Sequence, residues 1–283
     1  MLQHKNKISV TRLAEVLKVS RSGFYTWLKT RHQATSREKA REVRDVRVKE
    51  AFERSKSRSG ARRIRVELHE AGYSHDIKTI SKSMKRQNLL PKAARKFKIT
   101  TDSRHKLPVA PNLLDQNFEA SATNQKWAGD ITYLMTSEGW LYLAVVIDLY
   151  SRSVIGWSMS SQMTAKLTCD ALKMALLKRG SPKGVIFHSD RGSQYCSHAY
   201  RKLLDKYAFK QSMSRKGNCW DNACVESFFH SLKVESIQDE VLMDKKVMRE
   251  NVFEYIEIDY NRKRRHSSLG YLSPLNFELK NVA

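Results

Sequence analysis

The sequence predicts an α/β domain with a mixed five-stranded sheet, preceded by an all-α region, and three observations lead to this division. Apolar residues recur at helical spacing between residues 9 and 90. Beyond residue 126 they gather in short runs rich in β-branched and aromatic residues, as in strands. The charge changes as well, from 30 Lys and Arg against 12 Asp and Glu in residues 1–126 to 22 against 17 in residues 127–283.

The composition points to a nucleic-acid partner. A net charge of +23 attracts polyanions through phosphate contacts, although a merely solvated basic surface would give the same total. The four cysteines include no CxxC pair and begin only at Cys169, which argues against a zinc module. No run approaches the ~18 apolar residues of a membrane span, and the start MLQHKNK has no signal-peptide core. We therefore expect a soluble protein that stays inside the cell.

Residues 1–30 are expected to form a helix-turn-helix. The segment 9–28 reads as two short amphipathic helices with Ser20 as the N-cap of the second. That second helix would offer Arg21 and Tyr25 to DNA. Charges of both signs dominate the following segment 31–55, which is typical of a solvated connecting helix.

Residues 56–92 repeat this plan and form a second helix-turn-helix candidate. A helix containing Ile64 and Leu68 is followed by a stop at Gly72 and then by a second helical pattern. Basic residues that we expect to face phosphates decorate it: Arg62, Arg63, Lys78, Lys82, Lys85 and Arg86. Residues 93–124, rich in lysine, arginine and proline, are predicted to be a basic linker.

The segment 125–262 is predicted to be the α/β domain. Three strand-like runs, at 127–134, 141–147 and 154–159, are separated by turns and form a meander. A helix at 164–178, a strand from Val185, a helix at 198–207, a strand at 209–213 and a helix around Glu226 follow. Three antiparallel strands followed by αβαβα is the order of a ribonuclease-H-like domain, whose first and fourth strands are neighbours. Residues 263–283 remain as a basic C-terminal tail.

Three acids stand out as candidate catalytic and metal-binding residues. Asp130 interrupts an apolar strand, which is costly unless a cation offsets its charge. Asp190 follows the fourth strand at its carboxyl end, where open α/β sheets build sites. Glu226 shares one helix side with Asn222, His230 and Lys233. Carboxylates of this kind can hold one or two Mg²⁺ or Mn²⁺ ions for an in-line phosphoryl displacement.

Other acids near these positions are expected to have structural roles. Asp148 ends a strand before a turn, Asp221 looks like the N-cap of the Glu226 helix, and Glu235 lies on its opposite side. Lys233 lies two turns beyond Glu226 and could meet a phosphate. Arg215 and Lys216 belong to a loop beside the site and are candidate DNA contacts.

Long motifs give the chain a specific resemblance. DITYL, GWLYLAVVIDLYSR, HSDRGSQY, SMSRKGNCWDNACVESFFHSLKVE and YNRKRRHSSLGYLSP together resemble the catalytic protein of IS-three family bacterial insertion sequences, the OrfB-type DDE transposases. The resemblance implies a retroviral-integrase-like core in which Asp130, Asp190 and Glu226 are the DDE triad. One departure is WAGD, which replaces the more usual WVTD before the first Asp.

The resemblance also implies an activity and partners. It implies two Mg²⁺ or Mn²⁺ ions, cleavage at the element's terminal inverted repeats to free a 3′-OH, and attack of that hydroxyl on target DNA. Assembly as a homo-oligomer on DNA is expected, as is an upstream OrfA-type protein, often fused by frameshifting to give an OrfAB product. Because the sequence begins at a Met, we expect the OrfA-type region to belong to a separate upstream product.

Two other classes stay open at this point. One is a DNA-binding repressor of the element ends with an idle core, which metal-dependent nicking would exclude. The other is a tyrosine recombinase, suggested by Arg265, His266 and Tyr271, which would require a covalent protein–DNA adduct. No GxxxxGK[ST] loop is present in the sequence, which disfavours ATP-driven strand work.

Overall fold

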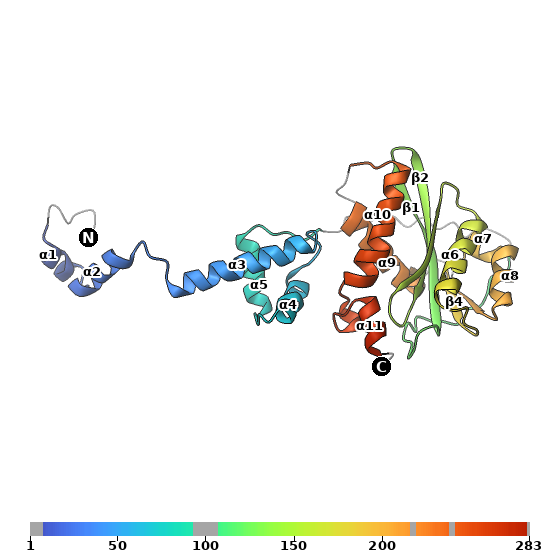
Figure 1. Cartoon of the computed structure of the whole chain (residues 1–283), viewed down its shortest axis with the longest axis horizontal. Helices are drawn as coiled ribbons and strands as arrows, with labels where there is room; N and C mark the ends of the chain where they lie inside the picture. The colour runs from blue at the N-terminus through green and yellow to red at the C-terminus, as the bar shows by residue number, and fades with distance from the viewer. Residues whose placement is uncertain (1–7, 93–106, 216–218, 238–240, 282–283) are drawn as a thin grey trace. The chain divides into compact units, whose positions relative to one another are not determined.

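The computed structural model describes residues 8–92, 107–215, 219–237 and 241–281, and the chain divides into two compact units, Met1–Pro91 and Lys92–Ala283. The first unit is helical in its described part (Figure 1). Its helices are α1 (Val10–Val16), α2 (Arg21–Thr30), α3 (Ser36–Arg54), α4 (Ala61–Glu70) and α5 (Ile77–Arg86). The prediction of an all-α region before the sheet is confirmed.

Side-chain caps and a small core explain these helices. Ser20 is the N-cap of α2, as predicted, and its hydroxyl accepts a hydrogen bond from the Gly23 N–H at 3.1 Å. Helices α3, α4 and α5 share an apolar core that includes Val48, Ile64 and Ile80. Asp45 on α3 also accepts hydrogen bonds from Ser83 and Arg86 on α5. Arg86, expected to face a phosphate, therefore has a structural partner within this unit.

The second unit is built on the predicted mixed five-stranded sheet. Its strands are β1 (Lys126–Thr136), β2 (Gly139–Asp148), β3 (Val154–Ser160), β4 (Ile186–Ser189) and β5 (Lys210–Met213), in the spatial order β3-β2-β1-β4-β5. The strands β1, β2 and β3 pair antiparallel, whereas β4 is parallel to both β1 and β5. The predicted ribonuclease-H-like strand order, with the first and fourth strands adjacent, is confirmed.

Helices cover both faces of the sheet (Figure 1). On one face α6 (Ala165–Lys178), α7 (Ser193–Cys196) and α8 (His198–Lys206) cover a core that includes Trp127, Val146 and Phe187. On the other, α9 (Ala223–Leu232) and α10 (Lys245–Glu254) cover a core that includes Leu143 and Phe228. The side chains of β2 alternate between these two cores. Odd-numbered residues from Leu141 to Ile147 face α9, and even-numbered residues face α6.

Two glycines allow close packing around the sheet. A Cβ at Gly156 in β3 would lie 2.3 Å from the carbonyl oxygen of Ala171, so α6 rests directly on the strand backbone. A Cβ at Gly129, next to Asp130, would lie 2.7 Å from Cζ of the buried Phe187. The Phe187 ring thus fills the space that the Thr of the more usual WVTD would need at position 129.

The C-terminal part is more structured than a tail. Helix α10 continues into the π-helical segment η3 (Tyr255–Lys263), and the chain ends in η4 (Ser267–Leu269) and α11 (Pro274–Asn281). Arg264 pairs with Glu235, and Glu278 of α11 pairs with Arg179 at the end of α6. Arg265, considered above for a recombinase, donates a hydrogen bond to the backbone carbonyl of Tyr271. Residues 264–281 therefore pack against the core.

Over the described ranges, none of the helices combines the length and apolar character that crossing a membrane would need.

Candidate active site

The register of β1 and β4 brings Asp130 and Asp190 together. Ala128 is paired with His188 in the last parallel pair between these strands. Asp130 lies two residues after Ala128, and Asp190 lies two residues after His188. The two acids are therefore at the same height along the paired strands and on the same face of the sheet. Asp130 accepts a hydrogen bond from the Ile131 N–H at 2.7 Å, and Asp190 accepts one from the Gly192 N–H at 2.9 Å.

The electrostatics of Asp130 reflect this pairing. Burial raises the pKa of the Asp130 carboxyl well above its usual value, and the neighbouring charges of Asp190 and Glu226 raise it further. The Ile131 N–H and the Lys233 ammonium act in the opposite direction and lower the pKa. Two adjacent carboxylates that disfavour each other's ionisation form a site that a cation would stabilise.

Glu226 lies within electrostatic reach of this pair without joining it. It occupies the first turn of α9 and is exposed, although partial burial raises the pKa of its carboxyl. The start of α9 is held against β1, because the Asn222 amide donates to the Gly129 carbonyl at 3.4 Å. Within the part of the chain that the structure describes, no three His, Cys, Asp or Glu residues are grouped closely enough to hold a metal ion.

The donor set nevertheless fits a hard divalent cation. Mg²⁺ prefers oxygen ligands and is typically held by one or two carboxylates together with waters and substrate phosphate. Asp130 and Asp190 supply two such carboxylates, and a cation would offset the burial and the neighbouring negative charge that raise the pKa of Asp130. Glu226 could complete the set after a movement of its side chain.

Lys233 lies at the end of α9, where the helix passes into the π-helical segment η2 (Lys233–Ile237). Its ammonium lies 5.3 Å from the centre of the Tyr133 ring on β1. Burial lowers the pKa of Lys233, and the charge of Asp130 partly opposes this effect. Lys233 therefore lies within electrostatic reach of Asp130, and its contact with a phosphate stays a prediction.

Asp221 joins three segments at the start of the Glu226 helix. This fully buried carboxylate accepts hydrogen bonds from the Arg215 backbone and guanidinium, at 2.8 and 3.0 Å, and from Asn112 and Gln116 at 3.2 and 3.0 Å. The prediction that Asp221 is the N-cap of this helix is wrong, since Asn222 takes that position. Sequence reasoning missed the real role because Asn112 and Gln116 lie more than a hundred residues earlier in the chain.

Two residues beside Asp221, Arg215 and Lys216, are candidate DNA contacts, and the structure describes only the first. The Arg215 guanidinium is paired with Asp221, with a second carboxylate, Asp115, at 3.8 Å, and about half of its side chain stays exposed. The Arg215 guanidinium could therefore contact a phosphate only through its exposed part. Lys216 lies outside the described residues.

The pairing of Asp221 predicts a pH-dependent contribution to stability. Although burial opposes it, the hydrogen bonds from Arg215 lower the pKa of Asp221 to about 2. A carboxylate whose pKa is lower in the folded state stabilises the fold above its unfolded pKa and loses that effect as pH falls. We expect Asp221→Asn to lower the free energy of unfolding by about 1–3 kcal/mol at pH 7. The difference from wild type should shrink as pH falls from about 4 towards 2 in urea titrations. A difference independent of pH would contradict this assignment.

The remaining acids near the site have structural partners. Asp148, at the end of β2, is fully buried and accepts hydrogen bonds from the backbone N–H groups of Asn124 and Tyr150. Glu235 accepts them from Arg264 and from the Tyr255 hydroxyl. These contacts agree with the expectation that neither acid belongs to the catalytic set.

In the helical unit the candidate DNA contacts lie on three helices: Arg21 and Tyr25 on α2, Arg62 and Arg63 on α4, and Lys78, Lys82, Lys85 and Arg86 on α5. Arg21 and Tyr25 on α2 are exposed, and Arg21 donates to the Thr11 hydroxyl of α1 at 3.3 Å. On α4, Arg62 is exposed, whereas Arg63 is half-buried with its guanidinium 3.5 Å from the Arg58 carbonyl oxygen.

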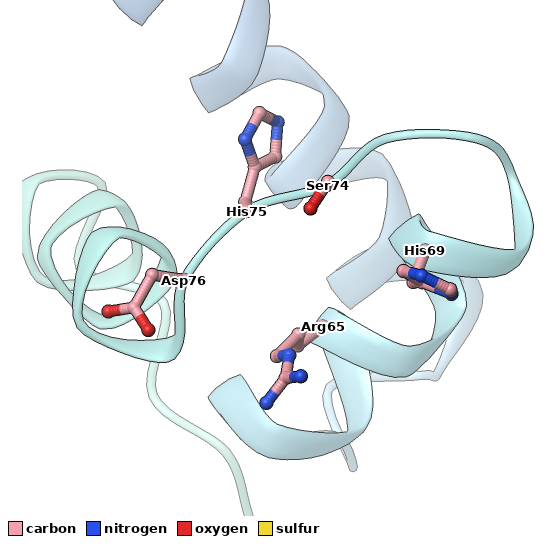
Figure 2. A pocket seen from close by; sticks show the side chains of 5 residues that line it. All are labelled: Arg65, His69, Ser74, His75 and Asp76. Atoms are coloured by element: carbon pink, nitrogen blue, oxygen red, sulfur yellow. The ribbon is translucent and has the colours of Figure 1, made fainter.

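A hollow between α4 and α5 adds basic residues that sequence reasoning did not name. It is lined by Arg65, His69, Ser74, His75 and Asp76. Figure 2 shows Arg65 and His69 on α4, Asp76 at the start of α5, and the His75 ring turned away from Arg65. The positions 62, 65 and 69 follow the i, i+3, i+7 spacing of one helix face, and this spacing could have identified Arg65.

Comparisons with known proteins place this geometry in context. Two family models, both described as integrase core domain, match residues 120–219 and 207–274. The transposase InsF for insertion sequence IS3A from Escherichia coli K12 is 56% identical over 281 residues, covering 99% of this chain and 98% of that protein. An uncharacterized 31 kDa protein of insertion element IS600 from Shigella sonnei is 44% identical over 268 residues, covering 95% of this chain and 98% of its own length.

Solved structures with similar chains are more distant. One is the simian T-cell lymphotropic virus intasome in complex with PP2A regulatory subunit B56 gamma, with a TM-score of 0.48 and 16% identity, covering 75% of this chain and 73% of that one. Another is the HTLV-2 integrase catalytic core domain in complex with magnesium, with a TM-score of 0.43 and 17% identity, covering 56% and 99%.

Proposed function

The chain belongs to the IS3 family of transposases, and we propose that Asp130, Asp190 and Glu226 carry out its DNA cleavage and joining. The protein is a DNA transposase with an integrase core, and enzymes of this class transfer polynucleotide strands. The observation that carries the proposal is the β1–β4 register, in which Asp130 and Asp190 follow the Ala128–His188 pair.

The chemistry proposed is a transesterification. A 3′-OH freed at the element's end attacks a phosphodiester of the target DNA, so one P–O bond forms as another breaks and no covalent protein intermediate is needed. Two Mg²⁺ or Mn²⁺ ions, when bound, would stabilise the attacking and leaving oxygens. Asp130 and Asp190 would hold the ions, and Glu226 would join them once DNA is bound. Lys233, next to these carboxylates, is suited to contact a phosphate.

The partners follow from the same proposal. The DNA bound would be the element's terminal inverted repeats and the target. The exposed Arg21, Tyr25 and Arg62, together with Arg63, Arg215 and Lys216, would add contacts outside the carboxylate site. We further propose a homo-oligomer on DNA and an OrfA-type partner, and that the protein acts at the bacterial nucleoid, where this DNA lies.

The decisive experiment is a nicking and strand-transfer assay on a labelled element-end duplex. Wild type and Asp190→Asn are compared with Mg²⁺, with Mn²⁺ and with EDTA. Joining that needs the metal and disappears in the variant is the expected result. Binding without cleavage would indicate either a missing OrfA-type partner or a repressor, and repeating the assay with the fused partner separates these two.

The proposed phosphate contact of Lys233 predicts a change in salt dependence. The logarithm of the DNA-binding constant falls linearly with the logarithm of the salt concentration, and each neutralised phosphate makes this slope steeper by about 0.9. Lys233→Ala should therefore reduce the slope by about one, whereas Lys246→Ala, which removes an exposed lysine of α10, should leave it unchanged. Fluorescence anisotropy on element-end DNA at four or more salt concentrations measures both slopes. Equal slopes for Lys233→Ala and wild type would exclude the contact.

A further inference from the structure

One face of the β1–β2 hairpin presents an exposed group of large side chains. Tyr133 pairs with Tyr142 and Met135 pairs with Trp140 across the hairpin. Directly opposed residues, and residues two apart, share one face of a sheet, so these four side chains lie together. We call them the hairpin face. Met135 is 48% exposed and Trp140 is 44% exposed.

The packing of the sheet does not account for this exposure. On the same face further along β2, Ala144 and Val146 are buried in the core under α6. Towards the turn of the hairpin, Tyr133 and Trp140 instead pack on each other, with ring centres 5.2 Å apart at an angle of 82°. The edge-to-face arrangement holds the Trp140 ring in place while leaving much of its surface open.

The hairpin face is connected to the carboxylate site through Lys233. The ammonium of Lys233 lies 5.3 Å from the Tyr133 ring centre and within electrostatic reach of Asp130. Asp130 and Tyr133 leave β1 on opposite faces, but β4 pairs with β1 only at residues 126–128. Beyond that point this edge of β1 is covered by the start of α9, where Asn222 contacts the Gly129 carbonyl. Lys233 thus connects the two faces around the edge.

The separation between Asp130 and Tyr133 along β1 corresponds to the length of a few nucleotides. Three residues of β-strand separate Asp130 from Tyr133, which is about 10 Å along β1. One strand of duplex DNA advances about 3.4 Å per nucleotide, so this length corresponds to roughly three nucleotides. A DNA strand that passes around this edge of β1, with its reacting phosphate at Asp130 and Asp190, would bring a base to the hairpin face about three nucleotides away.

We propose that the hairpin face stacks unpaired bases of the DNA strand whose phosphodiester reacts at Asp130 and Asp190. Tyr133 and Trp140 supply the aromatic surface, and Lys233 contacts a phosphate between that surface and the carboxylates. Stacking on aromatic rings accepts any base and needs no hydrogen-bond pattern. Residues 127–283 carry 22 Lys and Arg against 17 Asp and Glu, and the Lys233 ammonium lies beside the Tyr133 ring, so a polyanion suits this surface better than a second copy of the chain. The inference rests on the proposed function and adds a binding site for unpaired nucleotides to it.

The test measures binding with EDTA present, so that it does not depend on cleavage. Two element-end DNAs are compared, one fully paired and one unpaired over the five nucleotides next to the reacting phosphodiester, with 2-aminopurine placed at each of the five positions in turn. Trp140→Ala should weaken binding of the unpaired DNA by about 5- to 150-fold and leave the paired DNA unchanged. The change in 2-aminopurine fluorescence should be largest about three nucleotides from the phosphodiester, and it should be lost in the same variant.

Two control variants make the result specific. Trp140→Phe keeps an aromatic ring and should retain most of the binding. Leu177→Ala removes an apolar side chain of α6 that is more exposed than Trp140, and it should have no effect on either DNA. Circular dichroism and urea unfolding of each variant establish that it folds.

The outcomes separate this inference from the proposed function. Metal-dependent joining by wild type, together with unchanged binding of unpaired DNA by Trp140→Ala, would overturn the inference alone. An absence of joining in the wild type fused to its partner would overturn the proposed function, whatever the binding data show. If Trp140→Ala alters the oligomer mass in light scattering but not DNA binding, the hairpin face is a contact between chains and the inference is wrong.

Discussion

Replacing Glu226 by Gln should eliminate strand joining while leaving the affinity for element-end DNA within about twofold of wild type. The substitution keeps the shape of the side chain but removes the charge that would help to hold a divalent cation beside Asp130 and Asp190. Losing a single group that stabilises a transition state typically costs about 10²–10³ in rate, and a metal ligand belongs to this class. Joining and binding are measured on the same labelled duplex in the presence of Mg²⁺.

The structure makes this prediction a strict test. Glu226 is exposed, and among the described residues no three candidate ligands are grouped closely enough to hold a metal. A matched control is Glu250→Gln, which removes an exposed carboxylate from α10 and should keep full activity. If both variants join DNA equally well, Glu226 is an ordinary surface acid and the proposed triad is wrong. If Glu226→Gln also loses DNA binding, the role of its helix is structural.

The sheet could be predicted because its signals are local. Each strand is a short apolar run bounded by turn residues, and Asp148, Gly184 and Gly139 mark three of those boundaries. The strand order then follows from chain order, since a fourth strand that follows a three-stranded meander and a helix pairs with the first. Val225, Phe228 and Leu232, the buried residues of α9, likewise follow the spacing of one helix side, which is a local signal.

The C-terminal part escaped prediction for a physical reason. Helix α10 and its π-helical continuation have apolar residues, such as Met248, Val252 and Ile256, that are buried against other elements. The positive charges between 262 and 265 made the following segment resemble a solvated tail. Arg264 has its partner, Glu235, 29 residues earlier in the chain, and no local pattern indicates that pairing.

The positions of the candidate site residues in the fold could be predicted in part, whereas their catalytic role stays a prediction. Asp130 and Asp190 were identified from strand positions, and the register between β1 and β4 explains why they meet. Asp221 was assigned a helix-capping role because capping is a local rule, whereas its actual partners Arg215 and Asn112 come from separate segments. Residues that hold the site together through such distant contacts are the ones that a single sequence does not reveal.

The buried ion pair of Arg264 and Glu235 provides the largest expected effect on stability. Arg264 donates from Nε and Nη2 to the Glu235 carboxylate at 3.0 and 2.9 Å and from Nη2 to the Ser231 hydroxyl at 2.9 Å. Glu235 also accepts from the Tyr255 hydroxyl at 2.9 Å. Both side chains are at most 16% exposed, and the carboxylate raises the pKa of Arg264 above its ordinary value despite the opposing effect of burial.

Arg264→Met should therefore lower the free energy of unfolding by about 3–5 kcal/mol, because it leaves the Glu235 carboxylate buried without its cation. The double variant Arg264→Met, Glu235→Leu should recover much of this loss, since replacing both partners of a buried pair by apolar residues is often neutral. Arg215→Met should cost less in the same urea titrations, because Asp221 keeps its hydrogen bonds from the Arg215 backbone, Asn112 and Gln116. A cost for Arg264→Met no greater than that for Arg215→Met would mean that the pair is open to solvent. Because Ser231 and Glu235 lie within and just beyond the helix that carries Glu226, loss of this pair should also loosen the end of that helix near Lys233.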